Sequence, residues 1–585
     1  MLSSLPISVE LAVHKDAQLK PLLLRRRPNL SALFNRRFQS DLATPKPPLD
    51  LSHHFSRVTL ARKPSDTKQF YRYFDVPGVG NLSAGFPDPT FFPYDTIETK
   101  IAQPESFKLT LKNPSDRPNS AISSQLRASH IPGEEDSNQT IDDLATVLQY
   151  GTAQGYTPLY SFLKQFTREN ILRNVPYING PDIIPTCGST DGFSQVLQAF
   201  TNTWSEGHDD SAQPRGLQIV PVTVDAEGIL AFGPRGLEDV LANWNEANGK
   251  RPHLLYTIPT GQNPTGAIPS IERRKEVYAV CSKYDVLIIE DDPCWHLQFP
   301  SAARLETAAR GLPPSPTEEQ DSALLNSSGS SYIDSLSPSY LNVDIEGRVV
   351  RLDTFSKSIA PGCRLGWITA QPAIIESLSC ITETSTGQAS GFVQAMVAQL
   401  LMGSQHAAKA EFAQVSSEDQ ASFAGWKFDG WVRWLEAVRG RYESRMNRMC
   451  TILEEGRFRV TPNASPTPIY TFSWPRGGMS VWIRVCFDTH PLADRLPGSA
   501  IAHALWMFML QKPHRVLVTP GDMFSPTDTV KEEHGWQYFR LCFAPVNEEE
   551  VEKSSRRFIR AVHAFWEITS EKEVERIESV DPFDD

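Results

Sequence analysis

The segment VVRLDTFSKSIAPGCRLGW, residues 349–367, carries the strongest indication of chemistry in this chain. It begins as a short apolar strand, then turns through hydroxyl side chains to a single lysine, Lys357. Arg364 follows seven residues later in a Pro/Gly loop. Such a lysine can hold an aldehyde cofactor as a Schiff base, while hydroxyls such as that of Ser356 and the guanidinium bind the cofactor's phosphate. An exposed loop lysine beside a structural arginine fits the same residues, so the rest of the chain is needed to choose.

Length and composition indicate a globular protein with more than one lobe. At 585 residues the chain exceeds one ordinary hydrophobic core, so two lobes with insertions are expected. A net charge of −12 argues against nucleic acid or an anionic membrane as partner, and no apolar run is long enough to span a bilayer. The 8 cysteines show no paired spacing. His53 and His54 are expected to be surface residues and His296 a packed or partly exposed one, so we expect no metal site.

Residues 1–50 are expected to lie outside the folded lobes, because residues 14–37 are rich in arginine and lysine and the sequence PKPP follows. A disordered basic tail fits this composition. A mitochondrial presequence is the alternative, although Glu10 and Asp16 weaken that pattern. We therefore expect a cytoplasmic protein, with a mitochondrial location as the alternative.

A second group of candidate residues lies between an apolar strand and an amphipathic helix. Apolar residues at i, i+3, i+4 and i+7 predict the helix over 193–200. Gly188, Ser189 and Thr190 precede it, where free N–H groups, the helix dipole and two hydroxyls favour a phosphate. A plain helix cap uses the same residue types, so the motif alone leaves both interpretations open.

Two further predicted strands end in polar residues. Residues 254–258 lead into PTGQNPTG, where Asn263 is either a ligand donor or a turn residue. After an intervening helix, residues 286–289 form a continuous apolar strand, which is typical of a parallel sheet. Asp291 follows that strand, at the edge where doubly wound sheets bind ligands.

The C-terminal half changes character. Residues 301–345 are Ser/Pro-rich and aperiodic, which predicts an insertion. The chain after residue 375 predicts an α+β lobe, with strands over 516–521 and 538–543. Arg540 interrupts the last of these, and a buried arginine needs an anion, either a structural carboxylate or a substrate.

Seven segments follow the order in which class I aminotransferases of pyridoxal phosphate fold type I carry them. They are NLSAGFPDPTFFP, LQYGTAQGYTPL, YTIPTGQNPTG, YDVLIIEDDP, VVRLDTFSKSIAPGCRLGW, WPRGGMSVWI and YFRLCFAPV. The chain resembles this family, and it looks closest to the fungal aromatic and 2-aminoadipate aminotransferases, relatives of the kynurenine aminotransferases. The resemblance implies an α/β fold with a mostly parallel, doubly wound sheet and a smaller α+β domain.

The resemblance also implies a domain plan. Residues 146–375 form the large cofactor-binding domain, with the insertion at 301–345, and residues 51–145 and 376–585 form the small domain. Pyridoxal 5'-phosphate lies between them and at a dimer interface, so a homodimer with shared active sites is implied.

Roles follow residue by residue from the resemblance. Lys357 matches the lysine that holds the cofactor and moves the substrate proton, and Asp291 matches the carboxylate beside the pyridine nitrogen. Asn263 matches the donor to the cofactor's 3-oxygen. The phosphate is matched by Gly188, Ser189, Thr190, Ser356 and Arg364.

The substrate residues are implied in the same way. Arg540 matches the clamp for the substrate α-carboxylate, with Asn263 and Gly85 beside it, and Tyr150 matches a tyrosine that reaches the neighbouring subunit's site. The implied reaction moves the amino group of an aromatic amino acid, kynurenine or 2-aminoadipate to a 2-oxo acid such as 2-oxoglutarate.

The chain departs from the family at two places. Cys294 stands where the family usually has a tyrosine that supports the 3-oxygen, and a thiol is a much weaker donor. Around Asp209 and Ser211 the chain lacks a strand and the aromatic turn that follows it. A missing central strand leaves unpaired backbone and a hole in the core. The alternative function is therefore a catalytically impaired aminotransferase-like protein with a non-catalytic or interaction role.

Overall fold

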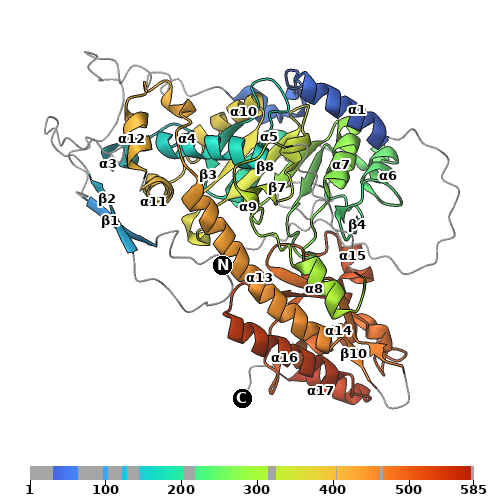
Figure 1. Cartoon of the computed structure of the whole chain (residues 1–585). Coiled ribbons are helices and arrows are strands. Elements are labelled where there is room, and N and C mark those ends of the chain that lie inside the picture. The colour runs from blue at the N-terminus through green and yellow to red at the C-terminus, as the bar shows by residue number, and fades with distance from the viewer. Residues whose placement is uncertain are drawn as a thin grey trace.

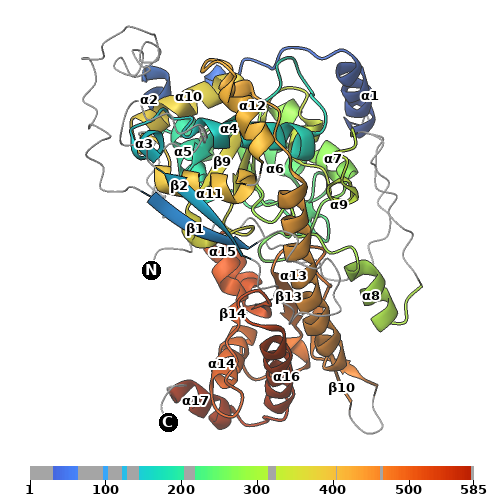
Figure 2. The same ribbon diagram turned by 60° about the vertical axis from the view of Figure 1, so that its left-hand side comes forward.

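The structure of the chain is a computed structural model, and it describes most of the residues between 30 and 580. The described ranges are 30–62, 96–102, 121–127, 144–202, 218–313, 325–403, 405–460 and 465–580. Figure 1 shows two lobes, an upper one built around one sheet and a lower one built around another, with the long helix α13 (Asp429–Glu455) running from one to the other. Figure 2 shows the same separation after a turn of 60°.

The sheet of the upper lobe has five strands in the order β3-β9-β8-β7-β6. Their bounds are β3 (Asp182–Thr186), β9 (Gly366–Ala370), β8 (Val349–Thr354), β7 (Leu287–Asp291) and β6 (Leu254–Thr257). β6, β7 and β8 run parallel, whereas β9 runs antiparallel to both of its neighbours. Four of the five strands therefore point the same way, which confirms the mostly parallel sheet expected from the sequence.

Helices cover both faces of this sheet because its strands are apolar on both sides. Along β7, Leu287 and Ile289 share a core with α5 (Ser189–Phe200) and α10 (Pro372–Glu383). Ile288, between them, belongs to the core formed with α7 (Ile271–Tyr284). Successive side chains of a strand point to opposite faces, so a continuous apolar run needs a helical layer on each side. This is the doubly wound arrangement.

The lower lobe is an antiparallel sheet packed against helices. Its strand order is β12-β13-β15-β14, with bounds β12 (Tyr470–Phe472), β13 (Ser480–Val485), β15 (Tyr538–Cys542) and β14 (Thr519–Pro520). The helices around it are α13, α14 (Gly498–Leu510), α16 (Glu548–Phe565) and α17 (Glu571–Ser579). The strand predicted over 516–521 is wrong in length: Val516 and Val518 are buried in the core, but only Thr519 and Pro520 join the sheet.

Among the remaining elements, α1 (Leu30–Ala43) packs on α7 with Phe34 and Phe38 buried in the core. The described part of residues 1–50 therefore packs on the upper lobe, in contrast to the tail expected from the sequence. The other elements are α2 (Arg57–Ala61), β1 (Thr96–Ala102), β2 (Ala121–Arg127), α3 (Leu144–Leu148), α4 (Thr157–Phe166), β4 (Val224–Asp225), β5 (Gly228–Ile229), α6 (Leu237–Ala242), α11 (Gly391–Met402), α12 (His406–Ala413), α15 (Asp528–Glu533), β10 (Phe458–Arg459) and β11 (Thr467–Pro468). None of the helices that the structure describes has the length and apolar character needed to cross a membrane.

The segment 301–345, predicted as an insertion, contains short helices that the sequence did not predict. Its described flanks are ordered: α8 (Ala302–Ala309) packs on α13, and α9 (Ser331–Asp334) carries the fully buried Ile333. Arg310, just after α8, pairs with Glu454 of α13 at 2.9 Å. Helices this short contain too few residues to show a 3.6-residue period, which is why the sequence read as aperiodic.

The predicted domain limits at residues 145 and 375 stay a prediction. In the structure, α10 packs on α5 and β3, and α11 packs on α3 and α4, all in the upper lobe. At the other end of the chain, the Ser56 hydroxyl donates to the carbonyl of Gln198 in α5 at 2.9 Å. This packing favours a boundary near α13 for the second limit.

The strand that the sequence lacks near Asp209 would precede β6 in the chain. The joint from Asp209 to Ser211 lies outside the described residues. Where the described chain resumes, residues 218–223 form no strand, and within the described part of the chain β6 pairs only with β7. β6 is thus an edge strand in the described sheet.

Candidate functional site

The candidate site lies where the two lobes meet, at the carboxyl ends of the parallel strands. β7 ends at Asp291, β6 leads into the loop that carries Asn263, and β8 leads into the turn that carries Lys357. From the lower lobe, Arg540 of β15 donates through Nη1 to the Asn263 Oδ1 at 2.7 Å. Residues that are far apart in the sequence are therefore brought to one edge, as expected for ligand binding in an open α/β sheet.

A cup for an anion forms at the start of α5. Gly188 is the residue before the helix and has φ of +92°, and a Cβ placed there would lie 2.6 Å from the Arg364 Nη2. The guanidinium of Arg364 donates to the hydroxyl of Ser356 and to the carbonyl of Cys187, each at 3.2 Å. Free N–H groups of the first helical turn, a hydroxyl and a guanidinium thus surround one position, which suits a phosphate.

The members of this cup differ in exposure. Ser189, the first residue of α5, is half-buried, and Thr190 and Arg364 are exposed. Ser356 is fixed by the hydroxyl of Thr354 at 2.9 Å. The cup is therefore open to an entering phosphate while its serine is held in place.

Lys357 lies in the turn after β8, and its side chain is exposed. The imidazole of the buried His296 hydrogen-bonds the backbone of Lys357. This hydrogen bond helps to fix the turn that carries the lysine. Cys294 is buried near the lysine ammonium, and burial raises the pKa of the Cys294 thiol to about 12. Cys294 is therefore a neutral thiol at physiological pH and cannot replace a phenol as a strong donor.

Only one of the two carboxylate oxygens of Asp291 accepts a hydrogen bond from a described residue. Tyr256 donates its hydroxyl to the Oδ2 at 2.7 Å, whereas the buried Oδ1 has no hydrogen-bond partner among the described residues. Burial raises the pKa of Asp291 to about 6. A buried carboxylate oxygen without a donor is costly. A protonated ring nitrogen would satisfy it, so this position fits the pyridine of the cofactor that the resemblance implies.

A cluster of buried charged side chains lies at the ends of β7 and β8, next to the site. Arg351 of β8 is fully buried and contacts the carboxylates of Asp292 at 3.0 Å and Asp353 at 2.8 Å. Glu290 lies 3.3 Å from the same guanidinium. Arg351 thus balances carboxylates on both sides of the position that Asp291 occupies, and it keeps the two strand ends together.

Arg540 presents its guanidinium without a carboxylate partner among the described residues. It lies over the Phe524 ring, with 4.6 Å from the Cζ to the ring centroid. Its Nε is buried and lacks a hydrogen-bond partner within the described structure. Of the two anions considered from the sequence, the described chain supplies no structural one, so the arginine is available to a ligand carboxylate.

Two predicted residues lie apart from this group. Tyr150 is on the surface with 70% of its area exposed. Gly85 lies outside the described residues.

The sequence analysis gave no role to Tyr256, Arg351 and Phe524, whereas His296, expected to be packed or partly exposed, is buried. Only Arg351 had a signal, a charge inside an apolar strand.

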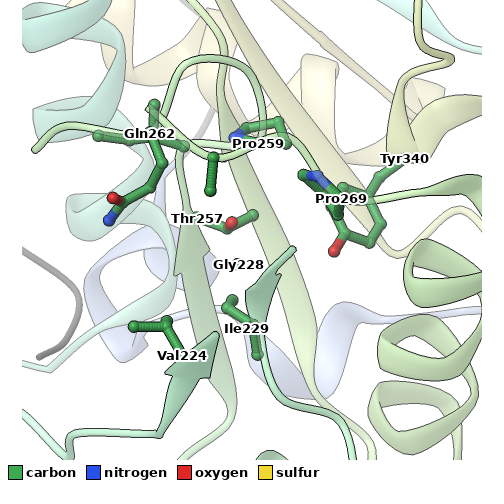
Figure 3. Close-up of a pocket in the computed structure, with 10 residues that line it drawn as sticks. Val224, Gly228, Ile229, Thr257, Pro259, Gln262, Pro269 and Tyr340 are labelled. Atoms are coloured by element: carbon green, nitrogen blue, oxygen red, sulfur yellow. The ribbon is translucent and has the colours of Figure 1, made fainter. Parts of the chain in front are cut away.

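A separate small cavity lies beside the carboxyl end of β6 (Figure 3). The figure shows Val224 and Ile229 of the β4–β5 hairpin on one side, with Gln262 and Pro259 on the other. The full lining is Val224, Gly228, Ile229, Thr257, Ile258, Pro259, Gln262, Ala267, Pro269 and Tyr340. This lining has no charged side chain, so the cavity cannot hold a phosphate or a substrate carboxylate as the cup and Arg540 can.

Comparison with known proteins agrees with this geometry. The family model for aminotransferase class I and II matches residues 140–558. An aromatic amino acid aminotransferase of Schizosaccharomyces pombe is 32% identical over 87% of this chain and 97% of its own length. The L-tyrosine:2-oxoglutarate aminotransferase atrD of Tapinella panuoides is 31% identical over 77% of each chain.

Among solved structures, aminotransferase Aro8 from Candida albicans superposes with a TM-score of 0.69 at 28% identity, covering 89% of this chain and 100% of its own. The sequence match and the structural match therefore agree over nearly the whole chain. The chain belongs to the class I and II aminotransferases, whose cofactor is pyridoxal 5'-phosphate.

Proposed function

We propose that this aminotransferase moves the amino group of an aromatic amino acid to a 2-oxo acid such as 2-oxoglutarate. The names of the Schizosaccharomyces and Tapinella relatives support this substrate class. Kynurenine and 2-aminoadipate are further donors to test. The observation that carries the proposal is Arg540, whose guanidinium faces Asn263 from the other lobe and has no carboxylate partner in the described chain.

The cofactor residues have distinct tasks in this proposal. Gly188, Ser189, Thr190, Ser356 and Arg364 bind the phosphate. Asp291 accepts a hydrogen bond from the ring nitrogen through its unpaired Oδ1 and keeps that nitrogen protonated. When bound, pyridoxal phosphate supplies an electron sink that makes the Cα proton of an amino acid removable.

Lys357 and Arg540 act on the substrate. Arg540 binds the α-carboxylate with its planar fork and so orients the Cα–H bond. The amine of Lys357 takes the Cα proton and returns it at the cofactor side, as a general base and then a general acid. The second half-reaction, with the 2-oxo acid, uses the same residues in reverse order.

The partners and the location are part of the proposal. We propose a homodimer with shared sites, in which the exposed Tyr150 is covered by the second subunit. Size-exclusion chromatography with light scattering tests the dimer. A cytoplasmic location, with mitochondria as the alternative, is tested by cell fractionation.

The experiment that tests the function is an absorbance titration of the purified protein with pyridoxal phosphate, followed by tyrosine, phenylalanine, kynurenine or 2-aminoadipate. We expect a bound-cofactor band that shifts to the amino form of the cofactor with an aromatic donor and shifts back with 2-oxoglutarate. Lys357→Ala should bind cofactor but show no turnover. A band that ignores every donor would refute the proposal and support the impaired alternative raised by the joint near residue 209.

A further inference from the structure

Two adjacent histidines contact one aspartate in the upper lobe, where α7 ends and leads into β7. His53 and His54 lie in a 3-10 turn, Ser52–His54, and Asp285 ends helix α7. The His53 Nε2 lies 2.6 Å from the Asp285 Oδ2, and the His54 Nε2 lies 3.2 Å from the Oδ1. One ligand atom from each residue can be chosen so that all three lie within 4.8 Å of one another.

His54 corrects the expectation that both histidines are surface residues. It is only 4% exposed, and neither of its ring nitrogens has a hydrogen-bond partner in the described part of the chain. Its contact with Asp285 is close but does not have hydrogen-bond geometry. A buried imidazole without a partner is costly, and a metal ion would satisfy it.

Asp285 is held in the orientation that a ligand needs. Its backbone is left-handed, with φ of 57°, and Arg348 donates to its Oδ1 at 2.8 Å. The Oδ2 hydrogen-bonds the His53 Nε2 at 2.6 Å, and a cation bound between these two atoms would replace the proton they share. Metal-binding carboxylates commonly keep such an outer hydrogen bond on the second oxygen.

We propose that His53, His54 and Asp285 bind a divalent transition-metal ion of the class that prefers imidazole, such as Zn²⁺, with water completing the shell. Two nitrogens and one carboxylate oxygen are a typical donor set for this class. The Arg348 charge makes the site weaker than an all-acidic one, but it does not occupy the Oδ2. The metal would fasten the segment around residues 52–61, which packs on α5, to the end of α7. This inference replaces the sequence expectation that the protein has no metal site.

Cobalt is the probe that tests the proposal. The full-length protein with bound cofactor is treated with a chelator, dialysed and titrated with Co²⁺, and the visible absorbance of the bound ion is followed. We expect one tight site per chain, and at least about tenfold weaker binding in both His53→Ala and His54→Ala. The matched control is His503→Ala, because His503 is an exposed histidine that also pairs with a single carboxylate, that of Glu578 at 2.9 Å.

A second measurement covers the case in which His54→Ala weakens folding. His53 is exposed, so His53→Ala leaves the core intact, and Zn²⁺ should raise the unfolding temperature of the wild type and of His503→Ala but not of His53→Ala. The proposal is overturned if Co²⁺ binding is absent, if both histidine variants bind as tightly as the wild type, or if the spectrum shows thiolate ligation by cysteine.

Discussion

Replacing Gly188 by alanine tests the phosphate cup most directly. The glycine has φ of +92° and ψ of 168°, a region that is almost restricted to glycine, so alanine costs about 1–3 kcal/mol of backbone strain. The new Cβ would also lie 2.6 Å from the Arg364 Nη2 and would push the guanidinium out of the cup. A lost charged hydrogen bond costs about 1.5–3 kcal/mol. We therefore expect pyridoxal phosphate to bind about 10- to 150-fold more weakly.

The assay is a titration of the apoprotein with pyridoxal phosphate, followed by quenching of tryptophan fluorescence. The matched control is Gly362→Ala, because a Cβ at Gly362 meets nothing within 4 Å although the residue lies in the same loop as Arg364. Gly362→Ala should bind the cofactor like the wild type. If Gly188→Ala binds as tightly as the wild type, Arg364 and the start of α5 do not form the phosphate cup.

Three further predictions follow from named contacts. Asp291→Asn should raise the unfolding temperature of the apoprotein at pH 7 but not near pH 4. The folded-state pKa of about 6 lies above the ordinary 3.8, so ionisation of the carboxylate lowers the stability of the fold as pH rises between these values. Calorimetry at both pH values checks this, and equal gains at the two would contradict it. Arg540→Lys should lower kcat/KM by about 10- to 150-fold, since the ammonium keeps the charge but loses the bidentate fork. Steady-state rates with tyrosine measure this loss, and an unchanged kcat/KM would exclude Arg540 from carboxylate binding. Arg351→Met should destabilise the fold by about 3–5 kcal/mol in urea unfolding, because it leaves buried carboxylates unpaired, whereas Arg441→Met, at an exposed position of α13, should have little effect.

The elements that position the site were predictable because their sequences are locally consistent. The strand ending near Leu352 and the helix after Gly188 both occur where apolar periodicity and turn residues placed them. The parallel sheet followed from the continuous apolar run of β7. These features depend on neighbours in the sequence, which is the information that a single sequence carries best.

The contacts that complete the site were not predictable, because their partners lie far apart in the chain. Tyr256 and Asp291 are 35 residues apart, and Arg540 and Asn263 are 277 apart. No periodicity links such pairs, since only the paired strands and the packed lobes bring them together. The burial of His54 was missed for the same reason: its neighbour is Asp285, on the far side of α7 in the sequence.

Because β9 runs back alongside β8, three residues of the site lie close together in the sequence, on the loop between these strands. The substrate arginine, in contrast, comes from the other lobe. The chain turns back after β8, and the loop closes where the N–H of Phe355 donates to the carbonyl of Leu365 at 3.0 Å. Ser356, Lys357 and Arg364 are therefore carried on one short loop, which closes on a timescale of about 10–100 ns in an unfolded chain. Arg540 can reach the site only after both lobes have folded. The phosphate cup also needs the start of α5, which belongs to the same lobe, so the upper lobe alone holds all the residues that bind the phosphate. The substrate carboxylate is recognised only once the lower lobe has added Arg540, so the cofactor can act as a template on which the second lobe completes the enzyme.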